Sequence, residues 1–281
     1  MSIVRRARPL LGTLIEIRVE GMQRNLASSA IDIAFAEIAR IHRLMSFHEP
    51  GSDLSRLHRA RTGAWVSVDA RTREVLAYAL RVARESNGCF DPTVAAEQVA
   101  SGYLPQPHSP FVPDSNASWR DIELNDDGVR LCKPLWIDLG GIAKGYAVDR
   151  AVEILLETGA PQTCVNAGGD LRIAGPRAEC VHVRDASGAI AAAVELGDAA
   201  IASSTSVPAH ATAAHRDGEN KQPIEGGVTA SVIAANCMTA DALTKVVLAR
   251  GAASARTLAA FGAQARVHDL RSGRDTFGVA A

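Results

Sequence analysis

The chain has 281 residues, of which 47% are hydrophobic and 22% charged, and its formal net charge is -1. This length exceeds the usual size of one domain, and the composition is ordinary for a globular protein with a substantial core. The balanced charge gives no electrostatic reason to expect nucleic acid or an anionic membrane as a partner.

The N-terminus and the cysteines bear on the compartment. Arg5-Arg6 could suggest an export signal, but no apolar stretch long enough for a signal peptide follows. No segment reaches membrane-spanning length without charges. The five cysteines are scattered and include no Cys-x-x-Cys pair, which argues against a disulfide framework or a structural zinc site. We therefore expect a cytoplasmic protein without a membrane span.

The first half of the chain alternates between apolar patterns and turn signals. They predict a strand over 11–20, an amphipathic helix over 26–45, a short helix after the N-cap Ser52, and a helix over 70–86 that Asn87-Gly88 ends. After this last helix, Pro92 keeps Asp91 out of helical geometry, which predicts a turn.

The second half contains more strands. The pattern predicts an irregular connection over 102–116, short strands within 119–137, a helix over 146–157, strands near 180–184 and 191–196, a polar loop over 205–229, a buried strand over 231–235, and a helix over 239–250 that closes on Gly251. Helices and strands interleave, yet strands also follow one another directly, which predicts a two-layer α+β fold. We expect one domain over 1–281, with two interleaved α/β subdomains as the alternative.

The most informative segment is 138–149, where an apolar run leads into a paired-glycine turn, Gly140-Gly141. Glycine can reach positive φ and lets a ligand lie against bare backbone. The amides at the start of the following helix would attract an anion such as a phosphate. Asp138 and Lys144 flank the turn with one charge of each sign. The segment favours a phosphorylated ligand, and the alternative is a structural turn beside a surface ion pair.

Two further segments carry polar groups in suggestive places. Residues 166–170 form a second paired-glycine turn, in which Asp170 serves a ligand or only caps its own backbone. On the helix over 239–250, Asp241, Thr244 and Lys245 share a face. A carboxylate and a hydroxyl suit Mg²⁺, which prefers oxygen ligands. The alternative is that Asp241 only complements the helix dipole.

Weaker candidates stand in turns and loops. The turn over 90–94 lines a ligand groove or starts a helix, and His48 could stack on a ring. His215 lies in the polar loop, where it is solvated or acts as a general base. The chain has no Gly-x-Gly-x-x-Gly, Walker lysine loop, nucleophile elbow or His-Glu-x-x-His motif, which disfavours the enzyme classes that depend on them.

Taken in order, these motifs resemble those of the ApbE family, the FAD:protein FMN transferases. The matching phrases are Leu11-Gly12-Thr13, Met45-Ser46 with the run from Ser52 to Leu57, Phe90-Asp91-Pro92-Thr93-Val94, the run from Asp138 to Gly145, Asn166-Ala167-Gly168-Gly169-Asp170, and Ala240-Asp241-Ala242-Leu243. The likeness spans nearly the whole chain.

The resemblance implies a two-layer α+β fold, related to the T-fold, with FAD in a central cleft beside Mg²⁺. It implies transfer of FMN from FAD to a threonine of an acceptor flavoprotein, with release of AMP. The residues that would contact FAD are Leu11, His48, Phe90, Asp91, Thr93, Asp138 and Lys144. The residues that would hold Mg²⁺ are Gly141, through its carbonyl, Asp241 and Thr244.

Two departures from the family pattern leave alternatives open. Lys245 stands where typical members carry a metal-binding threonine four residues after the aspartate. The family's His-x-x-Asp-Pro-Arg-Thr-Gly phrase is reduced to His215 without the Asp-Pro-Arg-Thr-Gly, and that histidine would activate the acceptor hydroxyl. The alternatives to transfer are hydrolysis of FAD to FMN and AMP, and a non-catalytic flavin-binding or maturation protein.

Overall fold

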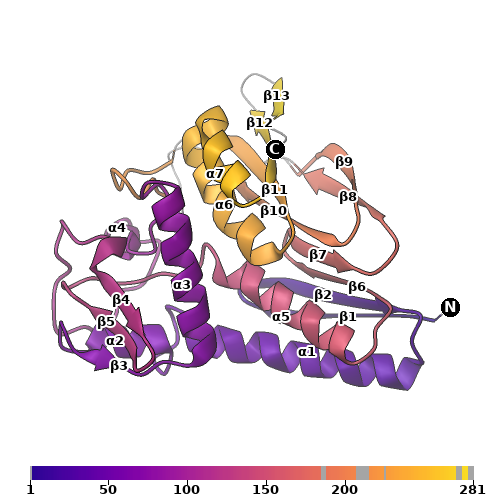
Figure 1. Ribbon diagram of the computed structural model, residues 1–281, viewed down its shortest axis with the longest axis horizontal. Helices are drawn as coiled ribbons and strands as arrows, with labels where there is room; N and C mark the ends of the chain where they lie inside the picture. The colour runs from indigo at the N-terminus through magenta and orange to yellow at the C-terminus, as the bar shows by residue number, and fades with distance from the viewer. Residues whose placement is uncertain (1, 185–187, 207–214, 225, 270–273, 278–281) are drawn as a thin grey trace. The chain divides into compact units, whose positions relative to one another are not determined.

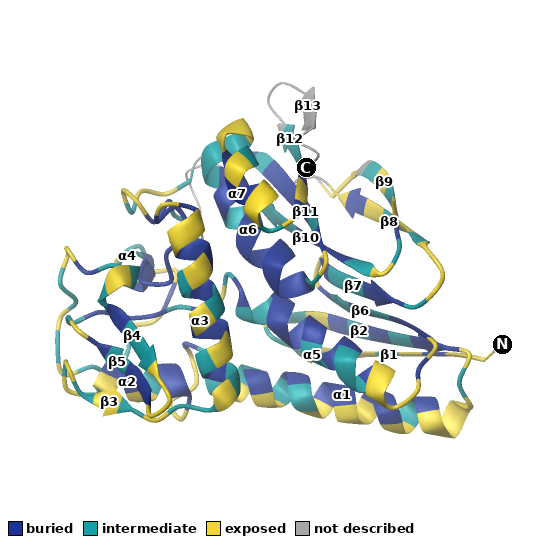
Figure 2. Cartoon of the chain, in the orientation of Figure 1, coloured by how far each residue is buried: buried dark blue, intermediate teal, exposed yellow. Residues whose placement is uncertain are grey.

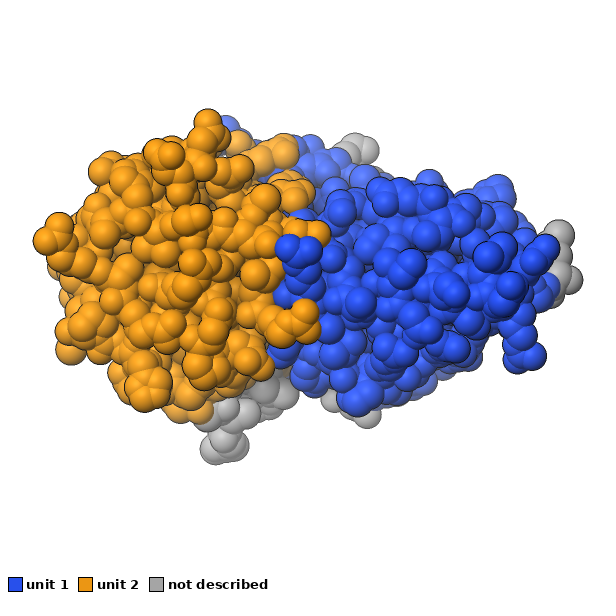
Figure 3. Space-filling view, turned by 90° about the horizontal axis from the view of Figure 1, so that it is seen from below, with its two compact units in different colours: residues 1–42, 144–205, 227–281 blue, residues 43–143, 206–226 orange. Residues whose placement is uncertain are grey.

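The computed structural model describes residues 2–184, 188–206, 215–224, 226–269 and 274–277 (Figure 1). The chain forms two compact units, coloured separately in Figure 3. Unit 1 comprises Met1–His42, Lys144–Thr205 and Gly227–Ala281, and unit 2 comprises Arg43–Ala143 and Ser206–Gly226. Each unit is therefore assembled from segments that are distant in the sequence. The single domain expected over 1–281 stays a prediction.

Unit 1 is built on an antiparallel sheet that has eight strands in the described part of the chain. In spatial order the strands are β1 (Ile3–Leu10), β2 (Thr13–Glu20), β6 (Gln162–Ala167), β7 (Asp170–Ala174), β10 (Ala199–Thr205), β11 (Val228–Ala234), β12 (Gln264–Asp269) and β13 (Arg274–Phe277). A hairpin of β8 (Glu179–Arg184) and β9 (Ile190–Leu196) accompanies the sheet. Val183 of β8 and Leu196 of β9 are buried with Ile173 and Ile201 of the sheet.

The helices of unit 1 cover this sheet. They are α1 (Arg24–Met45), whose last residues belong to unit 2, α5 (Ala143–Glu157), α6 (Cys237–Arg250), the 3-10 turn η2 (Gly251–Ser254) and α7 (Ala255–Ala260). Within the sheet, α6 packs against β7, β10, β11 and β12. It is buried along most of its length, as Figure 2 shows. A helix enclosed in this way must satisfy every polar side chain within the protein.

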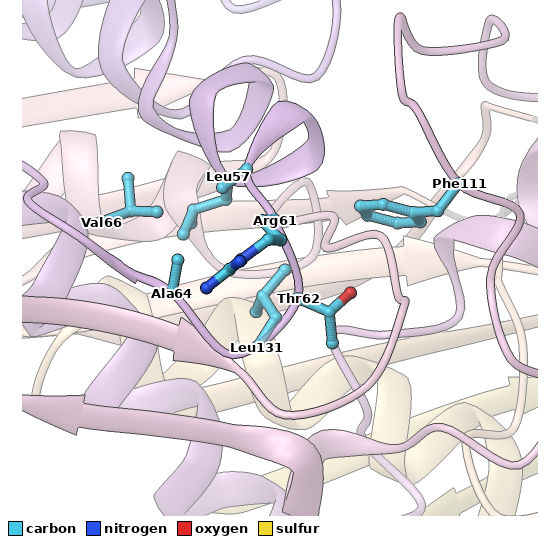
Figure 4. A pocket seen from close by; sticks show the side chains of 8 residues that line it. Leu57, Arg61, Thr62, Ala64, Val66, Phe111 and Leu131 are labelled. Carbon is cyan, nitrogen blue, oxygen red and sulfur yellow. The ribbon is translucent and has the colours of Figure 1, made fainter.

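Unit 2 is smaller and carries the remaining elements. They are α2 (Asp53–Arg59), β3 (Trp65–Val66), α3 (Ala70–Glu85), α4 (Ala95–Ala100), the 3-10 turn η1 (Trp119–Asp121), β4 (Ile122–Asn125) and β5 (Gly128–Leu131). Its three strands form a sheet in the order β3-β5-β4. One pocket of this unit, shown in Figure 4, is lined by Leu57, Phe111 and Leu131 among others but has no room for a water molecule.

The structure confirms most of the predicted elements. The helices over 26–45, 70–86 and 239–250 are α1, α3 and α6, and Ser52 caps α2 by accepting from the Ser55 amide at 3.1 Å. The helix predicted from Tyr146 begins three residues earlier, at Ala143. Among the strands that were not predicted are β1, β6, β7 and β10, and residues 135–137 are not a strand. The predicted loop over 205–229 lies between β10 and β11, although residues 207–214 and 225 fall outside the described residues.

The sequence analysis also made predictions about membrane spans and about the cysteines. Over the described residues, every helix is too short or too polar to cross a membrane. All five cysteines are free thiols, and Cys132 and Cys180 are exposed. A cytoplasmic location stays a prediction.

Candidate functional site

Helices α5 and α6 touch at Gly145, near the start of α5. A Cβ atom at this position would lie 2.3 Å from the carbonyl oxygen of Cys237. Side-chain carbon atoms do not approach backbone that closely, so only glycine allows the two helices to meet here. Gly145, the last residue of the 138–145 motif, therefore serves a helix contact.

Two aspartates cross-link the same pair of helices. Asp241 of α6 accepts from the Gly145 amide at 3.0 Å. In the other direction, Asp149 of α5 accepts from the amides of Cys237 and Met238, each at 2.8 Å. These amides belong to the first turn of α6, where backbone N–H groups lack helical partners. Each aspartate thus satisfies orphan donors of the neighbouring helix.

Lys144, Asp170, Asp241 and Lys245 form a group that we call the charged cluster. The Lys144 ammonium group is ion-paired with Asp170, and the Lys245 ammonium group with Asp241. Lys245 also donates to the backbone carbonyl of Asp241 at 3.0 Å. The side chains of Asp170 and Asp241 are 1% and 0% exposed, whereas that of Lys144 is 30% exposed. Lys144 is therefore the most solvent-accessible charge of the cluster.

The four charges act on one another. Burial would raise the pKa of Asp241, but the ammonium groups of Lys245 and Lys144 outweigh it and hold the pKa below its usual value. Burial would lower the pKa of Lys144, but the carboxylates of Asp241 and Asp170 raise it. Burial and the Asp241 charge raise the pKa of Asp170 to about 6. The cluster therefore stays ionised near neutral pH, with Asp170 its first member to take up a proton.

This raised pKa predicts a pH-dependent contribution to stability. Asp170 binds its proton more tightly in the folded chain, so its contribution is fully present below about pH 4 and is lost as the pH rises through about 6. We expect the stability of the wild type relative to Asp170→Asn to fall by about 1–3 kcal/mol between about pH 4.5 and 7.5. Urea unfolding at both pH values measures it. Asp198→Asn, at an exposed carboxylate of the same unit, is the matched control, and an unchanged difference for Asp170→Asn would refute the assignment.

Two hairpin turns explain the glycine motifs of unit 1. Gly168 and Gly169, with φ of 65° and 106°, form the turn between β6 and β7, and Asp170 begins β7. A Cβ on Gly168 would lie 2.3 Å from the Thr13 hydroxyl oxygen. Leu11 occupies the turn between β1 and β2 with a φ of 54°, which is costly for a residue other than glycine. The predicted contact of Leu11 with FAD stays a prediction.

The other predicted FAD contacts lie in unit 2. Phe90, Asp91 and Thr93 are buried, and His48 is exposed. Asp91 accepts from the amide and the hydroxyl of Thr93, both at 2.8 Å, so part of its role is structural. Burial raises the pKa of Asp91 to about 6. Asp138 is joined to this turn, because its amide donates to the Pro92 carbonyl at 2.8 Å.

The predicted magnesium ligands are divided between the units, with Gly141 in unit 2 and Asp241 and Thr244 in unit 1. The Thr244 hydroxyl donates to the backbone carbonyl of Asp241 at 2.7 Å and lies 2.8 Å from the Ser204 hydroxyl of β10. Among the described residues, no three His, Cys, Asp or Glu side chains gather closely enough to hold a metal ion. With Lys245 on Asp241, the residues of unit 1 do not fit Mg²⁺, because the ammonium group puts a positive charge where the cation would bind.

His215 of unit 2 lies next to a short antiparallel bridge. Its carbonyl accepts from the Ile224 amide at 2.9 Å, and Arg216 pairs with Pro223. Its role as a base stays a prediction.

The sequence left it open whether Asp170 serves a ligand or only caps its own backbone, and Asp170 was not among the predicted site residues. The signal for it was the Gly-Gly-Asp phrase, whose glycines and aspartate prove to have separate roles.

A family model described as the ApbE family matches residues 11–267. A protein of Vibrio cholerae named FAD:protein FMN transferase is 27% identical over 240 residues, which are 76% of this chain and 71% of that protein. One of the same name from Rhodobacter capsulatus is 28% identical over 181 residues, which are 59% of this chain and 34% of that protein. The chain thus matches only about a third of the latter relative's length.

Solved structures share the fold. The crystal structure of an ApbE protein from Thermotoga maritima has a TM-score of 0.84 and 24% identity, covering 99% of this chain and 97% of that one. The flavin transferase ApbE from Vibrio cholerae has a TM-score of 0.80 and 20% identity, covering 99% and 98%. These similarities confirm the mixed α+β fold predicted from the sequence.

Proposed function

The chain belongs to the ApbE family, and from that membership we propose that it transfers the FMN half of FAD to a threonine hydroxyl of an acceptor flavoprotein. AMP leaves as the second product. The observation that carries the proposal is the charged cluster. It draws residues from three of the segments by which the chain resembles the family, and Lys144 is its most exposed charge.

The reaction is a phosphoryl-type transfer. The threonine hydroxyl oxygen attacks the phosphorus atom of the FMN half. The bond from this phosphorus to the bridging oxygen breaks, and AMP departs with that oxygen and its electron pair. The hydroxyl proton passes to a base, for which we propose His215. Such reactions depend mainly on positioning and on positive charge that stabilises the transition state.

Lys144 is suited to supply such charge. An ammonium group has three donors, so Lys144 can keep its ion pair with Asp170 and still donate to a phosphate oxygen. Asp241 and Asp170 keep it charged, as the raised pKa of Lys144 shows. FAD contacts by Leu11, His48, Phe90, Asp91, Thr93 and Asp138 are part of the same proposal. A cytoplasmic location is a further part, consistent with five free cysteines.

A transfer assay tests the proposal. The full chain is incubated with FAD, Mg²⁺ and an acceptor domain that carries an Asp-x-x-Ser-Gly-Ala-Thr-like sequence, with a known family member in parallel. We expect covalent flavin fluorescence on the acceptor, none when its threonine is replaced by alanine, and a rate about 100-fold lower for Lys144→Met. Circular dichroism verifies that this variant is folded.

Two other results would each support one of the alternative functions. If FMN and AMP form without an acceptor, the chain hydrolyses FAD. If FAD binds tightly but no AMP is released, it is a flavin-binding or maturation protein. An unlabelled acceptor, while the known family member labels it, would contradict transfer.

A further inference from the structure

The carboxylate of Asp241 is enclosed by nitrogen donors. One oxygen accepts from the Gly145 amide at 3.0 Å, and the other from the Lys245 ammonium group. Asp241 is 0% exposed and the Lys245 side chain 13% exposed. A buried carboxylate requires a countercharge and hydrogen bonds. Both requirements are met within the chain.

The helix itself brings the countercharge into place. Asp241 and Lys245 are four residues apart on α6, a spacing at which an acid that precedes a base can pair with it. Lys245 holds the carboxylate and, at 3.0 Å, the backbone carbonyl of the same residue. These are two oxygen atoms of the kind that a hard divalent cation seeks. The ammonium group therefore binds the oxygens that such a cation would need.

The charges of the cluster are balanced without any added ion. Two carboxylates, Asp170 and Asp241, face two ammonium groups, those of Lys144 and Lys245. The chain has only four lysines, and two of them are here. A divalent cation at Asp241 would add two positive charges beside both ammonium groups, and their repulsion would oppose its binding.

We propose that Lys245 takes the place of a divalent cation at Asp241, so that this chain binds the diphosphate of its flavin dinucleotide through fixed ammonium groups and without a metal ion. This inference rests on the proposed function for the identity of the ligand. The cation at Asp241 is then the Lys245 ammonium group, in place of the magnesium ion that the sequence predicted.

The first arm of the test uses Mn²⁺ alone, titrated into the metal-free full chain and followed by electron paramagnetic resonance. The variants are Asp241→Asn, Lys245→Thr, which offers a hydroxyl in place of the ammonium group, and the double variant that combines the two changes. We expect that the wild type does not bind Mn²⁺ through Asp241. Lys245→Thr should bind Mn²⁺ about tenfold more tightly or better, and the double variant should lose this gain.

The second arm measures FAD affinity by flavin fluorescence in EDTA and in Mn²⁺. The wild type should bind equally in both. Lys245→Met should bind about tenfold more weakly, as expected for a lost charged hydrogen bond, and Lys245→Arg should keep most of the affinity. Lys133→Met is the matched control, since that lysine is paired with Asp121 in unit 2. Circular dichroism verifies the fold of each variant.

Three results would overturn the inference: Mn²⁺ binding by the wild type that Asp241→Asn abolishes, no gain of Mn²⁺ binding in Lys245→Thr, or FAD binding by the wild type only when Mn²⁺ is present. Failure of the proposed function has a different signature. In that case the wild type binds no FAD in either medium, while the Mn²⁺ arm still decides the role of Lys245.

Discussion

Replacing Asp241 by asparagine is expected to lower the free energy of unfolding by about 3 kcal/mol, because it removes one partner of a buried ion pair. The Lys245 ammonium group would be left with a neutral amide, and the Gly145 amide would lose a charged acceptor. Urea unfolding, read by circular dichroism, measures the change.

A double-mutant cycle isolates the interaction free energy between Asp241 and Lys245. Asp241→Asn combined with Lys245→Met removes both charges and should be more stable than the sum of the single changes implies, by about 1–3 kcal/mol. Asp32→Asn, at an exposed ion pair with Arg6 and Arg8, is the matched control and should have a much smaller effect. Strict additivity of the two changes in the cluster would contradict a direct ion pair.

Gly145→Ala is expected to destabilise the chain to a similar extent, although alanine favours a helix over glycine by about 1 kcal/mol. The new Cβ would lie 2.3 Å from the Cys237 carbonyl oxygen and 2.8 Å from the Met238 amide nitrogen. Both are backbone atoms, so α5 and α6 must separate. Their separation would strain the bonds that Asp149 and Asp241 make across the contact.

We expect a net loss of about 3 kcal/mol and a fall in Tm of about 6–12 °C, measured by calorimetry. Gly197→Ala is the control, because nothing lies within 4 Å of a Cβ at Gly197 and it carries no positive φ. A Tm for Gly145→Ala within about 2 °C of the wild type would mean that the helices can move apart without cost.

Two of the strands that the sequence did not predict, β1 and β10, lack a strong apolar pattern. The strand β1 carries Arg5, Arg6, Arg8 and Pro9, and it lies at the edge of the sheet, where proline is tolerated. β10, with the sequence Ala-Ala-Ile-Ala-Ser-Ser-Thr, consists largely of residues with weak strand preference, yet it pairs on both sides. In both cases the strand is stabilised by its neighbours in the sheet, which a local pattern does not reveal.

The candidate site also contains features that the sequence predicted and features that it did not. Asp241 and Lys144 were recognised from their motifs, and the i, i+4 spacing was sufficient to place Lys245 on the same face as Asp241. The ion pair between Lys144 and Asp170 could not be predicted, because it joins the start of a helix to a hairpin 26 residues away. The close contact at Gly145 could not be predicted either, because it depends on how α5 packs against α6.

The most direct test of transfer measures both products in one reaction of the full chain with FAD and an excess of acceptor domain. Released AMP and flavin covalently bound to the acceptor are quantified at the same time points. We predict that the two rise together in equal amounts, and that no AMP appears when the acceptor threonine is replaced by alanine. AMP released with free FMN, or no AMP from a chain that binds FAD, would contradict it.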